Sequence, residues 1–392
     1  MKDKTIQIKD SMSVKEKWIR LAAMIFFIAV AAAAFTYLVF FFFSGETGYV
    51  DISDTSGKAS CGSEFVLTYQ LGVSGTSPLA EKKAVTALYS EKVVYYYQLF
   101  HTAETFDGVT NMASLNRAVN RDLTVPSGLY EALAKAAADP GRNLYLAPIY
   151  AYYETLFASS YDEDAAAWDP ARNDALREEY AQALAFIASD EHVSLQLKKN
   201  NVVRLTVSKD YLAFADRVGY TAFVDFAWMK NAFIADLLAR DLTDAGYTHG
   251  TLSSLDGFAR NLDPAETEYA YEFYCSQRQI GGTLAYSGAA ALVTFHDFVL
   301  DPWEENLTYQ YADGTRVTRY ITAEDGLPHD ASGAVTVYSK TLDCADLLLA
   351  ALPAYTADAA KDLARPDVGV IWFDGKTVRN TPLDGFTFSK AR

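Results

Sequence analysis

The sequence predicts an α+β fold, in which helices flank a mixed sheet, behind one N-terminal transmembrane helix. Segments with strand-like and helix-like periodicity are interleaved along the chain, as they are in α+β domains. Half of the 392 residues are hydrophobic, so the chain can bury a large core. Residues 21–43 are uncharged and mostly apolar, and a helix of that length spans a bilayer.

The apolar run at residues 21–43 divides the chain. Residues 1–20 hold six basic and three acidic side chains, so the positive-inside rule predicts that this end is cytoplasmic. Residues 44–63 are small and polar and are predicted to be a linker, which leaves residues 64–392 as an extracytoplasmic domain. A cleavable signal peptide is the alternative, but its apolar core is usually shorter and no small-residue cleavage site follows this run. The predicted location is the cell membrane, as a single-pass protein.

Charge and cysteine content argue against some partners and sites. The formal net charge is −16, and a surface of that sign repels nucleic acid and anionic lipid headgroups, so neither is an expected partner. An oxidising exterior permits one disulfide among Cys61, Cys275 and Cys344, and Cys275–Cys344 is one conceivable pair. The sequence has no Cys-x-x-Cys motif and no Cys/His cluster, so a structural zinc site is not expected.

The expected elements follow the hydrophobic periodicity and the positions of glycine and proline. Helices are expected at residues 79–100, 127–138, 144–157, 175–188, 229–245 and 345–352. Strands are expected at residues 65–73, 123–125, 193–197, 202–207, 268–275, 282–286, 290–299, 307–311, 316–321, 335–338 and 368–373.

The stretch Val224–Asn261 carries the pattern around which the rest of the chain is organised. An apolar run, predicted to be a strand, leads into the helix 229–245, in which Leu238 and Leu242 recur at helical spacing and after which Gly246 acts as a stop. A strand, a tight turn and a helix in this order commonly build a ligand site in α/β domains.

Several short motifs occur in an order that resembles one known family. They are Met112–Asn116, Asp225–Asp236, Thr294–Phe298, Arg319–Pro328 and Ala345–Ala350. In this order they resemble the motifs of the extracytoplasmic flavin transferases of the ApbE type, the FAD:protein FMN transferases. The resemblance covers roughly residues 60–385 and implies a flavin-transferase-like (ApbE-like) domain.

The resemblance also implies a reaction. Members of the family move FMN from FAD to a threonine or serine hydroxyl of a redox partner protein, with Mg²⁺ on the phosphates. FAD, Mg²⁺ and a flavin-accepting membrane redox protein are therefore the expected cofactors and partner. The resemblance implies cofactor binding at Asp225, Ala227, Trp228, Asn231, Gly257 and Thr294, catalysis at Asp236 and His296, and metal binding at Asp346 and Ala232.

Four positions differ from the family's pattern. The family's Gly-Gly pair is Ala227-Trp228, its lysine is Asn231, its histidine is Arg319, and its metal-binding threonine is Ala350. Glycine lets backbone N–H groups approach a phosphate, and the threonine hydroxyl helps to hold magnesium, so these changes bear directly on the chemistry. Two hypotheses follow: flavin transfer, retained or weakened, and a non-catalytic flavin-binding or protein-interaction subunit of a membrane redox system.

The candidate residues also have structural interpretations. Trp228 can be a core side chain, Asp346 a helix-start aspartate, and His296 a hydrogen-bonded structural histidine. Asp225 and Asp236 are about three helical turns apart, so local geometry does not make them a close carboxylate pair.

Overall fold

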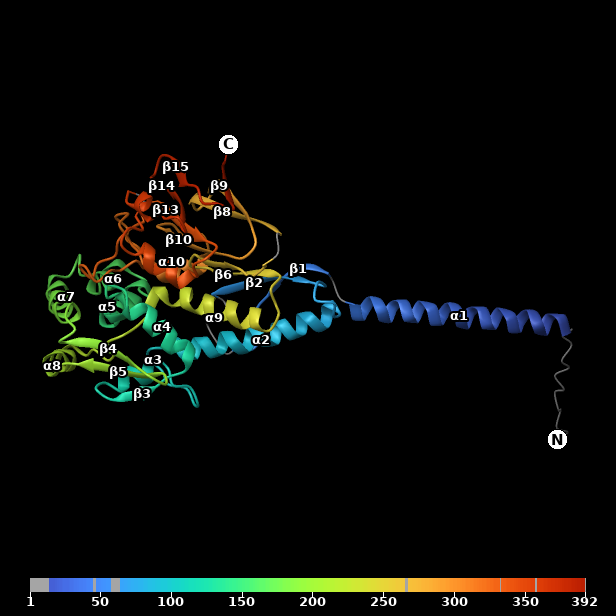
Figure 1. Cartoon of the computed structure of the whole chain (residues 1–392), viewed down its shortest axis with the longest axis horizontal. Helices are drawn as coiled ribbons and strands as arrows, with labels where there is room; N and C mark the ends of the chain where they lie inside the picture. The colour runs from blue at the N-terminus through green and yellow to red at the C-terminus, as the bar shows by residue number, and fades with distance from the viewer. Residues whose placement is uncertain are drawn as a thin grey trace, which may run out of the picture. The chain divides into compact units, whose positions relative to one another are not determined.

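The computed structural model, drawn in Figure 1, describes residues 14–44, 47–57, 64–264, 267–331, 333–356 and 358–391. Cys61, most of the predicted cytoplasmic end and part of the predicted linker lie outside these residues. The chain divides into two compact units, which are described separately: Met1–Gly48 with Leu71–Lys83, and Tyr49–Gln70 with Ala84–Arg392.

The first unit contains the helix α1, Val14–Ser44, which includes the apolar run of the sequence. Trp18, Phe27 and Phe35 are among its exposed side chains. Among the residues that the structure describes, no helix has both the length and the apolar character that crossing a membrane requires. The transmembrane helix at residues 21–43 and the membrane location stay predictions.

An eight-stranded sheet forms the centre of the fold, in the order β1-β2-β6-β7-β10-β13-β14-β15. Its strands are Gly48–Ile52 (β1), Phe65–Leu71 (β2), Gly250–Ser254 (β6), Phe258–Asn261 (β7), Ala290–His296 (β10), Ala334–Ser339 (β13), Gly369–Phe373 (β14) and Val378–Thr381 (β15). All pairs from β2 to β15 are antiparallel. The predicted α+β class is confirmed. The prediction of a mixed sheet is wrong for the strands from β2 to β15, because short connections such as β6–β7 and β14–β15 produce antiparallel neighbours.

Helices cover one face of this sheet and a smaller sheet covers the other. Helix α9 (Lys230–Asp244) packs on β6 and β7, and helix α10 (Cys344–Ala351) packs on β10, β13 and α9 (Figure 1). The smaller sheet, β16-β9-β8, contains Glu268–Ser276 (β8), Gln279–Ser287 (β9) and Phe386–Lys390 (β16). Its apolar side chains share a core with β10, β13 and β14, so β10 is buried along its whole length.

The chain between β2 and α9 adds helices around a third sheet, β3-β5-β4. Its strands are Asp122–Thr124 (β3), Val193–Lys198 (β4) and Val202–Val207 (β5). The helices are Pro78–Phe100 (α2), Met112–Arg117 (α3), Ser127–Ala137 (α4), Ala147–Phe157 (α5), Asp162–Ala167 (α6), Asp174–Ile187 (α7) and Lys209–Val218 (α8). The remaining short elements are the 3₁₀ helices Asn143–Tyr145 (η2), Ala227–Met229 (η3), Pro302–Leu307 (η4) and Ala360–Leu363 (η5), and the strands Tyr309–Gln310 (β11) and Arg316–Val317 (β12).

One side chain holds the segment before α9, where the predicted strand is absent. Asn116 Oδ1 accepts hydrogen bonds from the backbone N–H groups of Phe223 (2.9 Å) and Val224 (3.1 Å), and its Nδ2 donates to Val224 O (2.9 Å). These three bonds satisfy buried backbone groups that a neighbouring strand would otherwise satisfy. The predicted strand before α9 is therefore wrong. Hydrophobic periodicity could not show that the side-chain amide of Asn116, far away in the sequence, takes the place of a neighbouring strand.

The two described cysteines are not paired. Cys275 lies in β8 and Cys344 begins α10, and both are free and buried. The Sγ atom of Cys344 lies 3.4 Å from Ala259 O in β7. The prediction of a disulfide between Cys275 and Cys344 is therefore wrong.

Asn116→Ala is expected to destabilise the fold by about 3 kcal/mol, because it leaves three buried backbone groups without partners. Urea unfolding followed by tryptophan fluorescence measures this loss. Asn306→Ala is the control, since Asn306 is exposed and its side chain bonds only Trp303 O; a change within about 0.5 kcal/mol is expected. Equal losses in the two variants would contradict the role given to Asn116.

Candidate functional site

The turn that leads into α9 has a backbone conformation suited to glycine. Ala227, the first residue of η3, has a φ of 44°, in the left-handed region that costs a non-glycine residue roughly 1–2 kcal/mol. Asp225 Oδ1 accepts a hydrogen bond from Ala227 N at 3.0 Å and holds this turn. The backbone thus keeps a conformation that favours the family's glycine, although the residue is alanine.

A cavity of about 240 Å³ lies at the start of α9. It is called the α9 cavity below. Its aromatic walls are Tyr150, Tyr153, Phe157, Trp228 and Trp303. Its polar lining includes Glu64, Glu154, Lys230, Asn231, Asp256 and Arg319. The ring of Trp228 also packs edge-on against Tyr320, with 5.2 Å between centroids, so Trp228 is at once a core side chain and a wall of the cavity.

Asn231 connects two carboxylates beside this cavity. Its Nδ2 donates to Glu64 Oε2 at 3.0 Å and to Asp256 Oδ2 at 2.9 Å. Asn231 and Asp256 are 1% and 4% exposed, yet Asn231 Oδ1 and Asp256 Oδ1 have no hydrogen-bond partner among the described residues. Burial raises the pKa of Asp256 to about 6, although the charge of Arg319 opposes this. Two buried acceptors therefore remain unsatisfied at the cavity.

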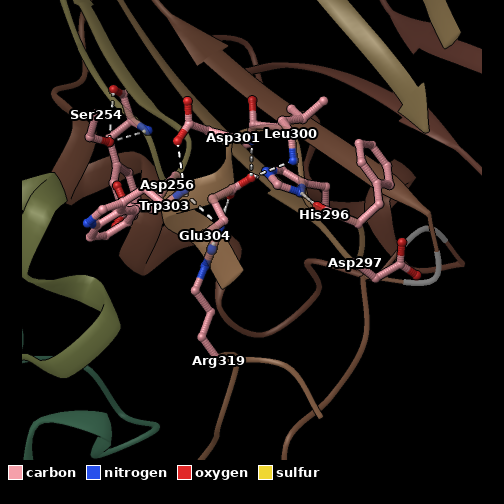
Figure 2. A network of polar contacts seen from close by, with 12 residues as sticks. Ser254, Asp256, His296, Asp297, Leu300, Asp301, Trp303, Glu304 and Arg319 are labelled. Carbon is pink, nitrogen blue, oxygen red and sulfur yellow. Dashed lines mark hydrogen bonds and ion pairs between the residues drawn. The ribbon is translucent and has the colours of Figure 1, made fainter. Parts of the chain in front are cut away.

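A buried ion cluster lies behind Asp256 (Figure 2). Glu304 Oε1 lies 3.2 Å from both Arg319 Nη1 and His296 Nε2, and Arg319 Nη2 donates to Asp256 O at 3.1 Å. Burial alone would raise the pKa of Glu304, but the hydrogen bond from His296 and the charges of His296 and Arg319 lower it to about 2. Glu304 is therefore the counter-charge that keeps Arg319 in place.

Both ring nitrogens of His296 face acceptors. Nδ1 lies 2.5 Å from Phe298 O, and Nε2 lies 3.2 Å from the Glu304 carboxylate. Both ring nitrogens are therefore engaged within the protein. The geometry matches the structural interpretation of His296, and its catalytic role stays an untested prediction.

The N-terminus of α10 is capped from α9. Asp236 accepts hydrogen bonds from the backbone N–H groups of Cys344 (3.0 Å) and Ala345 (2.8 Å) and pairs with Arg260 Nη1 at 2.6 Å. Burial raises the pKa of Asp236 to about 7 against the opposing charge of Arg260. These contacts give Asp236 a positioning role for α10, and its predicted catalytic role stays untested.

A lysine neutralises the carboxylates beside the predicted metal position. Lys135 Nζ on α4 lies 2.6 Å from Asp343 Oδ2 and 2.9 Å from Asp346 Oδ1. Burial would lower the pKa of Lys135, but the hydrogen bonds to Asp343 and Asp346 raise it above its ordinary value, so the side chain is an ammonium. Ala232, the other predicted metal position, is fully buried in α9 and has no polar side-chain atom.

The residues around the predicted metal position and the residues predicted to bind the cofactor line different cavities. Asp236, Asp343 and Lys135 line a second cavity of about 330 Å³, which shares no lining residue with the α9 cavity. Asn231 and Asp236 are five residues apart on α9, so they differ by about 140° around the helix axis. A cation bound between Asp343 and Asp346 would therefore not lie in the α9 cavity.

No protein-family model matches the sequence, and no curated protein sequence matches it. Solved structures do match. The ApbE protein from Thermotoga maritima superposes with a TM-score of 0.60 at 12% identity, over 85% of this chain and 97% of that chain. The flavin transferase ApbE from Vibrio cholerae superposes with a TM-score of 0.51 at 14% identity, over 88% and 98%. A mutant of the same enzyme gives 0.51 at 13% identity. The chain has an ApbE-like fold.

The ApbE-like fold confirms the expectation from motif order. It brings Ala227, Trp228 and Asn231 to one cavity, as the resemblance implied. Gly257 and Thr294 are in contact with each other, since Thr294 N donates a hydrogen bond to Gly257 O at 2.8 Å. Neither residue lines the α9 cavity. The Thr294 hydroxyl is engaged by Tyr271 and Thr336.

The lining of the α9 cavity does not fit a complete FAD. Pockets that bury ligands of drug size are usually roughly 300–1,000 Å³, and Trp228 occupies the place of a family glycine. Magnesium fits no better: Lys135 holds both carboxylates, and the described residues contain no group of three or more His, Cys, Asp or Glu side chains that could hold a metal. No chemical step through FAD or magnesium follows from these residues.

Sequence reasoning missed Glu64, Lys135 and Asp256 as site residues. Glu64 lies just after the predicted linker, Lys135 lies on a helix with no motif, and Asp256 lies in a turn where only the glycine was noted. Neither a buried carboxylate nor the lysine of a long-range ion pair has a local sequence signature, so no signal in the sequence would have identified these three residues.

Lys135→Ala is expected to create a divalent-cation site, because it frees Asp343 and Asp346 to share a metal. Millimolar Mn²⁺ should raise the melting temperature of the variant by ~2 °C or more and leave that of the wild-type protein unchanged. Differential scanning fluorimetry with and without Mn²⁺ measures this. Lys92→Ala is a matched control, since Lys92 pairs with the single carboxylate of Asp241 at 3.3 Å and should show no Mn²⁺ effect. An Mn²⁺ response in the wild type would contradict the account.

Glu304→Gln is expected to cost about 3–5 kcal/mol of stability, because it leaves the charge of Arg319 buried without a counter-charge and removes the carboxylate that His296 Nε2 contacts. The pKa of Glu304 is lowered in the fold, so its contribution is present above about pH 4.5 and is lost as the pH falls toward 2. Urea unfolding of both proteins at several pH values tests this. A stability difference that stays constant down to pH 2 would be the contrary result.

Proposed function

We propose that this chain is a membrane-anchored, extracytoplasmic protein with an ApbE-like fold that binds a small ligand and does not transfer FMN. The observation that carries this is the bridge from Lys135 to Asp343 and Asp346. The ammonium occupies the carboxylates beside the predicted metal position, while the cofactor-side residues line a separate cavity. A transferase needs a hard cation on the pyrophosphate it cleaves, and these residues provide no place for one.

The α9 cavity supports ligand binding rather than a purely structural role. Fully packed proteins leave few buried polar atoms unsatisfied, and here Asn231 Oδ1 and Asp256 Oδ1 are unsatisfied at the same cavity. The proposal keeps the transmembrane helix at residues 21–43, with the N-terminus in the cytoplasm. It also keeps the expected partner class, a membrane redox protein, on the strength of the resemblance.

Retained FMN transfer is the second candidate. The observation that favours it is the turn at Ala227, whose left-handed backbone and hydrogen bond to Asp225 keep the conformation of a glycine turn. The solved flavin transferase ApbE from Vibrio cholerae, which shares the fold, supplies the reaction to test.

AMP release separates the two candidates. The full chain in detergent, given FAD and Mg²⁺, is expected to release no AMP above a protein-free blank, because no described group holds the cation at the cofactor side. The Vibrio cholerae transferase under the same conditions is the positive control. Magnesium-dependent AMP release by this chain would overturn the proposal and establish the second candidate.

A further inference from the structure

We propose that the α9 cavity binds a small primary ammonium ion that carries an apolar, preferably aromatic, body. The inference rests on the proposed function, since it names the ligand class of that cavity. It follows from the charge, the unsatisfied acceptors, the walls and the size of the cavity.

The cavity has an excess of negative charge. Three carboxylates line it, those of Glu64, Glu154 and Asp256, against the two cations Lys230 and Arg319. The charge of Arg319 is already engaged by Glu304, which lies within 3.3 Å of both Nη1 and Nη2. Lys230 Nζ lies 3.7 Å from Glu64 Oε2. A ligand cation would balance the carboxylates that remain.

The neutral side chain of Asn231 accounts for part of this excess. Its amide bridges Glu64 and Asp256, a place where a cation would be attracted by both carboxylates. Asn231 also occupies the position of the lysine in the motif that the chain resembles. Lys230, one residue before that position, brings one ammonium to 3.7 Å from Glu64 Oε2, and a ligand ammonium would add a second positive charge to the cavity.

Three buried side-chain atoms of cavity-lining residues have no hydrogen-bond partner among the described residues: Trp228 Nε1, which is a donor, and Asn231 Oδ1 and Asp256 Oδ1, which call for donors. Both partners of Asn231 Nδ2 are carboxylate oxygens, so the amide orientation is defined and Oδ1 faces away from them. Asn231 Oδ1 and Asp256 Oδ1 can only accept when Asp256 is ionised, and both belong to side chains that are at least nine-tenths buried. An –NH₃⁺ group offers three donors, which is more than these two acceptors need.

The walls and the volume select the rest of the ligand. Tyr150, Tyr153, Phe157, Trp228 and Trp303 present five aromatic rings to the cavity. Aromatic faces attract cations and also pack against an apolar body. A volume of about 240 Å³ admits a small amine and excludes a dinucleotide.

Benzylammonium is the probe, with benzyl alcohol as the neutral analogue and benzoate as the anionic one. Isothermal titration of the full chain in detergent is expected to show benzylammonium binding at least ~10-fold more tightly than benzyl alcohol, and no binding of benzoate. Equal binding of benzylammonium and benzyl alcohol would overturn the proposal. So would the absence of binding by all three, which would mean that water alone satisfies the two acceptors.

Two variants place the binding in this cavity. Asn231→Lys puts an ammonium between Glu64 and Asp256 and is expected to weaken benzylammonium binding at least ~10-fold. Glu64→Gln removes one carboxylate and is expected to weaken it by a smaller factor. Glu131→Gln is the matched control, since Glu131 pairs with Arg240 at the second cavity and should leave the affinity unchanged.

Unchanged affinity in both Asn231→Lys and Glu64→Gln would overturn the site assignment. The AMP-release experiment has a separate outcome: it tests flavin transfer and does not depend on the ligand of the α9 cavity. Failure of one proposal is therefore distinguishable from failure of the other.

Discussion

The fold around both cavities depends on helix α9, which packs an apolar face on the sheet and carries one buried polar side chain, Asn231, and one partly buried, Asp236. Asn231 ties the helix to Glu64, which precedes β2, and to Asp256, which lies in the β6–β7 turn. Asp236 ties it to the N-terminus of α10 and to Arg260 in β7. A buried polar group must find partners, so these two residues specify how the helix sits on the sheet. They also define one wall of each cavity.

Both cavities are bordered by charge pairs within the protein. Lys135 pairs with Asp343 and Asp346, and Glu304 contacts both Arg319 and His296. A buried charge without a counter-charge is costly, so the contacts among the buried side chains of Glu304, Arg319 and His296 stabilise the fold. Asn231 differs from these pairs, because it joins the carboxylates of Glu64 and Asp256 through an uncharged amide.

The local parts of the fold could be predicted from the sequence. The apolar spacing in α9 and the stop at Gly246, which has a φ of 84°, are visible without a structure. The β4–β5 hairpin is visible in the same way, since Asn200 and Asn201 both adopt the positive φ that such turns need. The strand directions and the segment held by Asn116 could not be predicted, because they depend on partners far away in the chain. Motif order singled out Ala227, Trp228 and Asn231, which line one cavity, and their cofactor-binding role stays a prediction. Motif order could not show that Glu64, 167 residues away from Asn231, lines the same cavity.

The central claim is that Lys135 occupies the place where a cation would otherwise bind Asp343 and Asp346. Anomalous diffraction from crystals of the wild-type protein soaked in Mn²⁺ and FAD tests it most directly, because manganese scatters anomalously and marks its own position. The account predicts no manganese peak between the carboxylates of Asp343 and Asp346, with Lys135 Nζ in contact with both. A manganese peak there, with Lys135 displaced, would contradict it.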